Sequence, residues 1–107
     1  MKVLITGVAG LLGSRLADWI IENHPEYEVV GLDDLSGGYK ENVNPKVKFW
    51  NRHQENLLNS ENLDWVFEQE KPDYVFHCAS MLIQDSEALP RKAINTNVMG
   101  TLNVVDL

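Results

Sequence analysis

Three glycines near the start of the chain recur at every third position. They lie in the stretch Gly7-Val8-Ala9-Gly10-Leu11-Leu12-Gly13, so the pattern is G-x-x-G-x-x-G, one residue wider than the commonest dinucleotide-binding pattern. We expect Gly7 to turn the chain sharply, Gly10 to let a diphosphate approach the backbone, and Gly13 to let a helix pack closely on a sheet. The N–H groups at the start of that helix would then face the diphosphate.

A carboxylate follows the glycines at a fixed distance. Asp33 comes twenty residues after Gly13, at the end of an apolar run. A carboxylate there can accept hydrogen bonds from both hydroxyls of an adenosine ribose, and it would repel a 2′-phosphate. Asp34 is adjacent, and neither Lys nor Arg follows before Lys40. The sequence therefore predicts NAD rather than NADP, with a tight turn and solvated loop acids as the alternative.

Short apolar runs mark the strands that would position these residues. Each run is rich in β-branched or aromatic side chains, as is typical of parallel strands buried on both faces. The runs cover residues 2–6, 27–32, 47–50 and 73–78.

Helical patterns separate these runs. The first helix begins at Leu11 and ends before Pro25, with an apolar stripe expected at Leu12, Leu16, Trp19 and Ile20. A second begins near Ser60 and ends before Pro72, and its acids from Asp64 to Glu70 are expected to form a solvated face. A third follows Pro90 and continues to the last residues.

Strands that alternate with helices predict an α/β fold. We expect about four parallel strands in the spatial order 3-2-1-4 with flanking helices, an incomplete doubly wound sheet of the Rossmann type. The 107 residues form one domain, either a fragment or an unusually short natural protein. A half-sheet would leave an apolar face and edge uncovered, which predicts a homo-oligomer or a partner chain.

Composition excludes several classes of protein. The net charge is −7, and no basic stripe is present to follow a nucleic-acid backbone. Cys78 is the only cysteine, and the three histidines lack metal-ligand spacing, so we expect neither a disulfide nor a metal site. No apolar run approaches the ~20 residues of a membrane-spanning helix. We expect no membrane association and a cytoplasmic location.

Four segments together resemble the extended short-chain dehydrogenase/reductase family, and within it the UDP-glucose 4-epimerases and sugar-nucleotide dehydratases. They are residues 1–13 with the glycine turn, residues 29–38 with Asp33, residues 71–80, and residues 97–103. The resemblance runs through the whole chain but covers only the front third or so of such an enzyme. It implies an NAD-binding N-terminal portion, with the substrate-binding and catalytic portion absent.

The resemblance also implies further cofactor-binding residues. Added to the glycine turn and the two loop acids, they are Leu35, Ser36, Gly37, Asn56, Leu57, Cys78, Ala79, Ser80 and Asn97. Asn56-Leu57 departs from the family's usual Asp-Ile or Asp-Leu pair, although an amide can still bond to adenine. Leu82 lies about where epimerases often have a lysine, which favours the broad family over an epimerase.

The catalytic residues of that family are not found in this sequence. The family uses a Tyr-x-x-x-Lys pair, in which the tyrosine is the acid/base. Four residues after Tyr27, Tyr39 and Tyr74 come Gly31, Val43 and Cys78, and none is a lysine.

Two hypotheses about function therefore stay open. The chain is the NAD-binding portion of a nucleotide-sugar oxidoreductase, or it is a non-catalytic NAD(P)-binding module or redox-sensing subunit. The glycine turn argues against a flavodoxin-like regulator.

Overall fold

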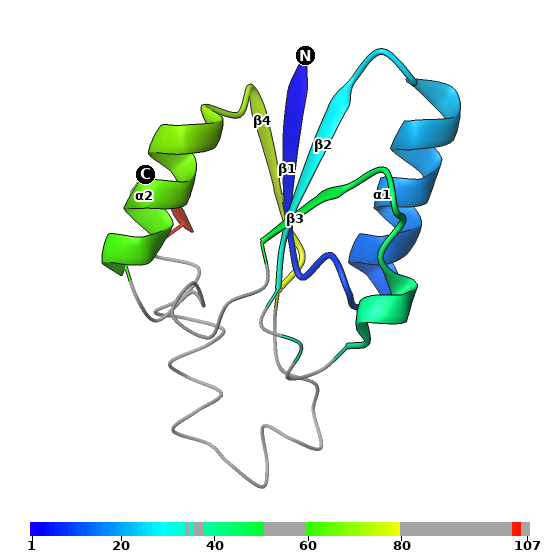
Figure 1. Cartoon of the computed structure of the whole chain (residues 1–107), viewed down its shortest axis with the longest axis horizontal. Coiled ribbons are helices and arrows are strands. Elements are labelled where there is room, and N and C mark those ends of the chain that lie inside the picture. Colours follow the sequence, from blue (N-terminus) through cyan, green and yellow to red (C-terminus); the bar gives the residue numbers. More distant parts are fainter. Residues whose placement is uncertain (34, 36–37, 51–59, 80–103, 106–107) are drawn as a thin grey trace, which may run out of the picture.

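The computed structural model describes residues 1–33, 35, 38–50, 60–79 and 104–105 (Figure 1). Its elements alternate between strand and helix, as the sequence predicts. In chain order they are β1 (Lys2–Thr6), α1 (Leu11–Asn23), β2 (Glu28–Leu32), the short 3-10 helix η1 (Lys40–Asn42), β3 (Lys48–Trp50), α2 (Ser60–Glu70) and β4 (Tyr74–His77). Each strand lies within its predicted run, and the first strand has the predicted bounds.

The described strands form one parallel sheet in the order β3-β2-β1-β4. β1 pairs with β2 from Lys2 opposite Glu28 to Thr6 opposite Leu32, and on its other side it pairs with β4. α1 and α2 lie on opposite sides of the sheet (Figure 1). The predicted Rossmann-type topology is therefore confirmed.

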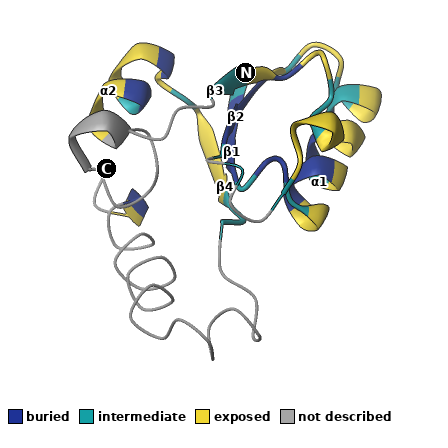
Figure 2. Cartoon of the chain, turned by 60° about the horizontal axis from the view of Figure 1, so that its bottom comes forward, coloured by how far each residue is buried: buried dark blue, intermediate teal, exposed yellow. Residues whose placement is uncertain are grey.

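The core lies on both faces of β1. Val3 and Ile5 pack on the α1 side with Ala17 and Ile20, while Leu4 packs on the α2 side with Val30 and Val66, among other residues. Side chains alternate between the two faces of a strand, so a strand covered on both faces needs an unbroken apolar run. Figure 2 shows β1 and β2 as mostly buried strands and β4, on the other side of β1, as an exposed one.

The buried face of α1 differs from the predicted stripe. Leu12 and Trp19 are 68% and 56% exposed, and the buried residues are instead Gly13, Ser14, Ala17 and Ile20. Three of these four side chains are small, which lets the helix axis lie close to the sheet. The predicted stripe is therefore confirmed at Ile20 and, in part, at Leu16, which packs against the core, and it is wrong at Leu12 and Trp19.

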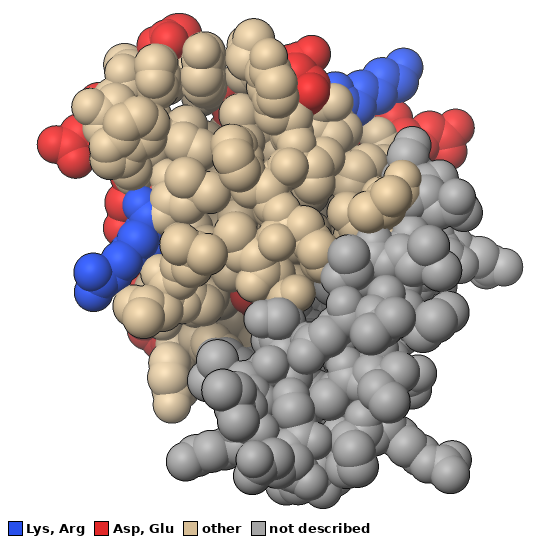
Figure 3. All heavy atoms as spheres, turned by 180° about the vertical axis from the view of Figure 1, so that it is seen from behind, with Lys and Arg blue, Asp and Glu red and all other residues tan. Residues whose placement is uncertain are grey.

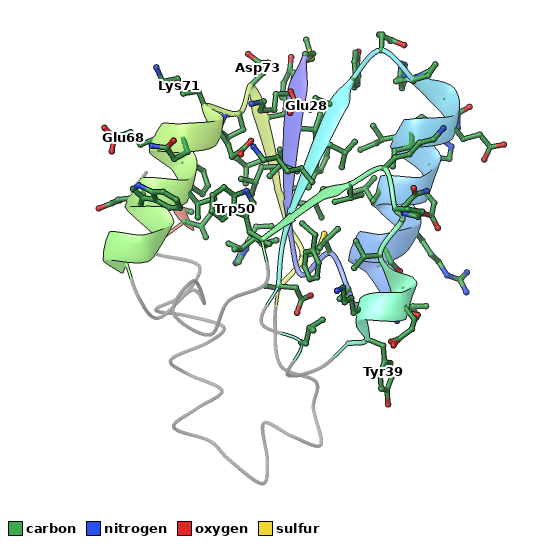
Figure 4. The ribbon with its side chains drawn as sticks, viewed as in Figure 1. Glu28, Tyr39, Trp50, Glu68, Lys71 and Asp73 are labelled. Atoms are coloured by element: carbon green, nitrogen blue, oxygen red, sulfur yellow. The ribbon has the colours of Figure 1, made fainter. Side chains whose placement is uncertain are left out.

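Glu70 contradicts the expected solvated acidic face of α2. It is only 2% exposed, and its carboxylate pairs with Lys2 of β1, at 3.3 Å, and with Lys48 of β3. Burial alone would raise the pKa of Glu70, but the hydrogen bonds and charges of Lys48 and Lys2 outweigh it and hold that pKa below its usual value. Glu68, by contrast, points away from the sheet into solvent (Figure 4).

β4 is the least covered strand of the described sheet. Tyr74, Val75 and Phe76 are 56%, 39% and 42% exposed, although β4 pairs fully with β1. This agrees with the expectation that an apolar face and edge would be left uncovered. On the face shown in Figure 3, charged side chains of the described residues lie mainly around the rim. Within the described chain, no helix is long and apolar enough to cross a membrane.

Candidate cofactor site

The glycine turn lies where the carboxyl ends of β1, β2 and β4 meet. Gly7 has a φ of +70°, in the left-handed region that favours glycine, and its N–H donates to the carbonyl of Leu32 at 2.8 Å. A Cβ on Gly7 would lie 2.8 Å from the backbone nitrogen of Ala79. Both the backbone angle and the space therefore require glycine, which confirms the sharp turn predicted at this position.

The other two glycines meet different surroundings. A Cβ on Gly13 would lie 2.1 Å from the carbonyl oxygen of Gly7, whereas a Cβ on Gly10 would meet that oxygen at 3.3 Å. Gly13 is therefore required for the close approach of α1 to the turn. Gly10 precedes α1 in an extended conformation, no side chain caps the helix there, and Leu11 and Leu12 beside it are exposed.

Asp33 is bound directly to the glycine turn. Its Oδ2 accepts the N–H of Ala9 at 2.9 Å, and its Oδ1 accepts the N–H of Leu35 at 2.7 Å. Leu35 has a φ of +63°, and the chain bends there so that the N–H of Leu35 points back to the carboxylate of Asp33. Each carboxylate oxygen can accept more than one hydrogen bond, so both keep acceptor capacity for a ligand hydroxyl.

The segment after Leu35 packs against the same turn from another side. A Cβ on Gly38 would lie 2.4 Å from the carbonyl oxygen of Ala9, so the two backbones are in close contact. The side-chain amide of Asn42, at the end of η1, donates to that carbonyl at 3.1 Å. Tyr39 projects away from this contact into solvent (Figure 4).

The end of β4 is fixed to the end of β1 by a hydroxyl group. Thr6 is fully buried, and its Oγ1 lies 2.6 Å from Nδ1 of His77 and accepts the N–H of Ala79 at 3.3 Å. Burial lowers the pKa of His77 and raises the pKa of the Cys78 thiol. Cys78 therefore stays protonated near neutral pH, as expected for a packed side chain rather than a nucleophile.

The structure brings most of the predicted site residues that it describes to this one edge. The glycine turn, Asp33, Leu35, Cys78 and Ala79 all lie at the carboxyl ends of neighbouring strands. Seven of the predicted residues lie outside the described residues, and their predictions stay untested: Asp34, Ser36, Gly37, Asn56, Leu57, Ser80 and Asn97.

Sequence reasoning missed two residues of this site. Thr6 was predicted only as part of a strand, and Asn42 lies in none of the predicted strands or helices. The position of Thr6 directly before Gly7 is a signal that was available, because the end of the strand must be fixed for the turn to be fixed. Asn42 gave no local signal, since its contact with Ala9 joins residues 33 positions apart.

Two further observations bear on where a ligand binds. A cavity of about 490 Å³ is lined by the end of α1 and the beginnings of β2 and β3, including Ile21, Val29 and Val47, at the opposite end of the strands from the glycine turn. Among the described residues, no cluster of His, Cys, Asp or Glu could hold a metal ion.

The chain was compared with known proteins. Residues 3–107 match the model of the NAD dependent epimerase/dehydratase family. The chain is 35% identical over 112 residues to the dTDP-glucose 4,6-dehydratase of Neisseria meningitidis, covering 98% of this chain and 30% of that protein.

Solved structures agree with this match. A UDP-glucose 4-epimerase of Thermotoga maritima, solved with UDP-glucose, has a TM-score of 0.90 and 34% identity over 99% of this chain. The Thermus thermophilus UDP-glucose 4-epimerase in complex with NAD has a TM-score of 0.88 and 31% identity, also over 99% of this chain. The chain spans about a third of the length of these three relatives, 30% to 33%. This chain belongs to the NAD dependent epimerase/dehydratase family.

Proposed function

We propose that residues 1–107 form the NAD-binding N-terminal portion of a nucleotide-sugar epimerase or dehydratase. The observation that carries this proposal is the hydrogen bond between Ala9 and Asp33, which holds a carboxylate against the glycine turn. A dinucleotide needs those two features side by side, because only a few covalent bonds separate its adenosine ribose from its diphosphate.

The hydrogen bonds of the turn indicate which amides would meet the diphosphate. The N–H groups of Gly7, Ala9 and Gly10 donate to Leu32, Asp33 and the Gly7 carbonyl. The first N–H groups of a helix have no partner within the helix. We therefore assign the diphosphate to the amides of Leu11 and Leu12, where the uncapped end of α1 carries partial positive charge.

The same carboxylate favours NAD over NADP. Both oxygens of Asp33 are held in place before a ligand arrives, by Ala9 and Leu35. A ribose diol can donate to them, whereas a 2′-phosphate would bring like charges together. The Thermus thermophilus relative was solved with NAD, which supports this choice.

The activity of the whole protein is also a proposal. A bound NAD would accept a hydride from a sugar carbon of a nucleotide sugar, and the residues outside this chain would supply the acid/base and the sugar-binding surface. Relatives solved with UDP-glucose and with NAD support this division of labour. We also propose a cytoplasmic location, and assembly with a second copy or with the rest of a longer polypeptide through the uncovered strand β4.

Calorimetric titration of the 107-residue chain with NAD and with NADP tests the cofactor assignment. We expect NAD to bind more tightly, and a free concentration 100 times its dissociation constant to add about 2.7 kcal/mol to stability. Asp33→Asn should weaken NAD binding by about tenfold, because a hydrogen bond to a charged acceptor contributes about 1.5–3 kcal/mol, against about 0.5–1.5 kcal/mol for a bond to a neutral one. Asp64→Asn, on the exposed surface of α2, is the matched control.

Two outcomes would reject parts of this proposal. If a folded chain bound neither cofactor at millimolar concentration, the NAD assignment would be wrong. If the chain bound NAD but the native gene encoded no Tyr-x-x-x-Lys pair downstream, the non-catalytic NAD-binding module would replace the enzyme.

A further inference from the structure

The peptide groups around Ala9 are held from both sides by side chains of one segment. The N–H of Ala9 donates to Asp33, which precedes Leu35, and its carbonyl accepts from Asn42, which ends η1. Gly38, between them, lies so close to the Ala9 carbonyl that a Cβ would approach it to 2.4 Å. Asp33 and Asn42 therefore fix the middle of the glycine turn at both its donor and its acceptor.

These two hydrogen bonds act on different atoms. Asp33 offers its carboxylate to the turn and, in the proposed function, also to the ribose. Asn42 touches the turn through its amide donor, and it lies on an element whose neighbours are exposed. Rotation of the peptide between Ala9 and Gly10 would turn the Ala9 carbonyl away from Asn42 and change the direction of the following amides at the start of α1.

We propose that Asn42 is a positioning residue for the cofactor: it presets the Ala9 carbonyl, and thereby the amides of Leu11 and Leu12, for the diphosphate. This inference rests on the proposed function, because it assigns a role within the same site. It adds a residue to the site that lies outside the G-x-x-G-x-x-G pattern and makes no direct contact with the cofactor in this role.

The chain offers a matched control in the same segment. Asn44 also donates a side-chain hydrogen bond of 3.1 Å, but to the carboxylate of Asp18 on α1 rather than to the turn. Asn42→Ala and Asn44→Ala therefore each remove an amide donor and its 3.1 Å bond, and Asn44→Ala also removes the 2.9 Å bond that its Oδ1 accepts from the N–H of Lys46. Asn42 is exposed, so its replacement leaves no cavity and the variant is expected to fold.

Titration of the 107-residue chain with NAD measures the effect. We expect Asn42→Ala to weaken NAD binding about five- to tenfold, the range of one neutral hydrogen bond, and Asn44→Ala to leave it within about twofold. Asn42→Gln keeps the donor and has room at the exposed end of η1, so it should recover most of the affinity. Asn42→Asp removes the donor and faces the carbonyl with a carboxylate, so it should bind more weakly than Asn42→Ala.

Amide hydrogen exchange separates positioning from a general effect on stability. In the free chain, Asn42→Ala should speed the exchange of the Ala9 and Gly10 amides while leaving those of β1 unchanged. Equal NAD affinity of wild type and Asn42→Ala would overturn the inference. So would an affinity loss accompanied by faster exchange throughout β1, which would indicate lost stability instead. If the wild type itself does not bind NAD, the proposed function fails, and unchanged exchange at Ala9 and Gly10 then rejects the positioning role separately.

Discussion

Gly10 and Gly13 separate two requirements that the glycine pattern combines. Gly13 is required by packing, because a Cβ there would lie 2.1 Å from the Gly7 carbonyl oxygen. Gly10 meets that oxygen only at 3.3 Å, a distance that a small shift relieves. One spacing in the sequence thus contains Gly13, which the fold needs, and Gly10, which in the proposed function the ligand needs.

Alanine substitutions at these two positions should therefore affect different properties, stability at Gly13 and NAD binding at Gly10. Gly13→Ala should lower the free energy of unfolding by about 3 kcal/mol or more, in the range of severe overpacking. Gly10→Ala should cost less than about 1 kcal/mol, yet reduce NAD binding, because its methyl group occupies the space of the diphosphate. Urea unfolding and NAD titration of both variants give the comparison. Equal stability of the two variants would contradict this reading.

His77 should make stability depend on pH below neutrality. Burial lowers the pKa of His77 in the folded chain below the 6.5 of a free histidine. Below pH 6.5 the unfolded chain therefore binds the proton more readily than the folded chain does, and stability falls as pH falls through the folded pKa. Urea unfolding between pH 7.5 and 5.5 should show this decline, and His77→Gln should reduce it. An unchanged slope in His77→Gln would assign the effect to another group.

At the scale of elements, Glu70 joins three of them. It ends α2, and its carboxylate pairs with Lys2 of β1 and Lys48 of β3. The contact anchors the last turn of the helix to the beginnings of two strands. Trp50 and Phe67 pack beside Leu4, Val30 and Val66 on the same side of the sheet (Figure 4).

Removing the charge of Glu70 should loosen α2. Glu70→Gln should cost about 2 kcal/mol, less than the 3–5 kcal/mol of a fully buried pair, because the Lys48 side chain is more than half exposed. The exposed Glu68→Gln should stay within about 0.5 kcal/mol. The folded pKa of Glu70 is below its usual 4.5, so its contribution is present above pH 4.5 and is lost as pH falls through the folded pKa. Thermal unfolding should show a difference in Tm between wild type and Glu70→Gln at pH 7, and a smaller difference at pH 3.

The elements also show what local patterns can and cannot predict. Strand and helix bounds follow from hydrophobic period, glycine and proline, all of which are local. The sequence therefore predicted both bounds of β1 and the first residue of α1, and it placed the end of α1 before Pro25. The predicted face of α1 was right at Ile20, which is buried, and wrong at Leu12 and Trp19, which are exposed. The small residues Gly13 and Ala17 pack on the sheet, and hydrophobicity alone does not single them out. Glu70 and Asn42 have partners 68 and 33 positions away along the chain, so no window of sequence contains both members of either contact.

At the scale of the whole molecule, β4 is the exposed strand at one edge of the described sheet. Phe76 and Tyr74 face the same side of the sheet as Ile5 and Val3, their partners in β1, but α1 does not cover them. An exposed apolar edge strand is a template for pairing with another chain.

The isolated chain should therefore self-associate through β4. Light scattering over a range of concentrations should show a mass that rises above that of the 12.2 kDa monomer. Phe76→Glu should shift the distribution toward monomer, because it places a charge on the uncovered face. Trp19→Glu, at an exposed aromatic residue of α1, is the control for a general gain in charge. A monomeric wild type at high concentration would contradict the prediction.

The central place of β1 has a consequence for the order in which the polypeptide acquires its shape. β1 precedes the other strands of the described sheet along the chain, yet the backbone N–H of Lys2 donates to the carboxylate of Asp73, 71 positions later. One edge of β1 therefore stays unpaired until β4 has been synthesised. Closing so long a loop before any contact compensates the lost entropy slows folding. Nascent chains arrested before β4 emerges thus carry an apolar strand, β1, with one unpaired edge, which is a binding site for a chaperone.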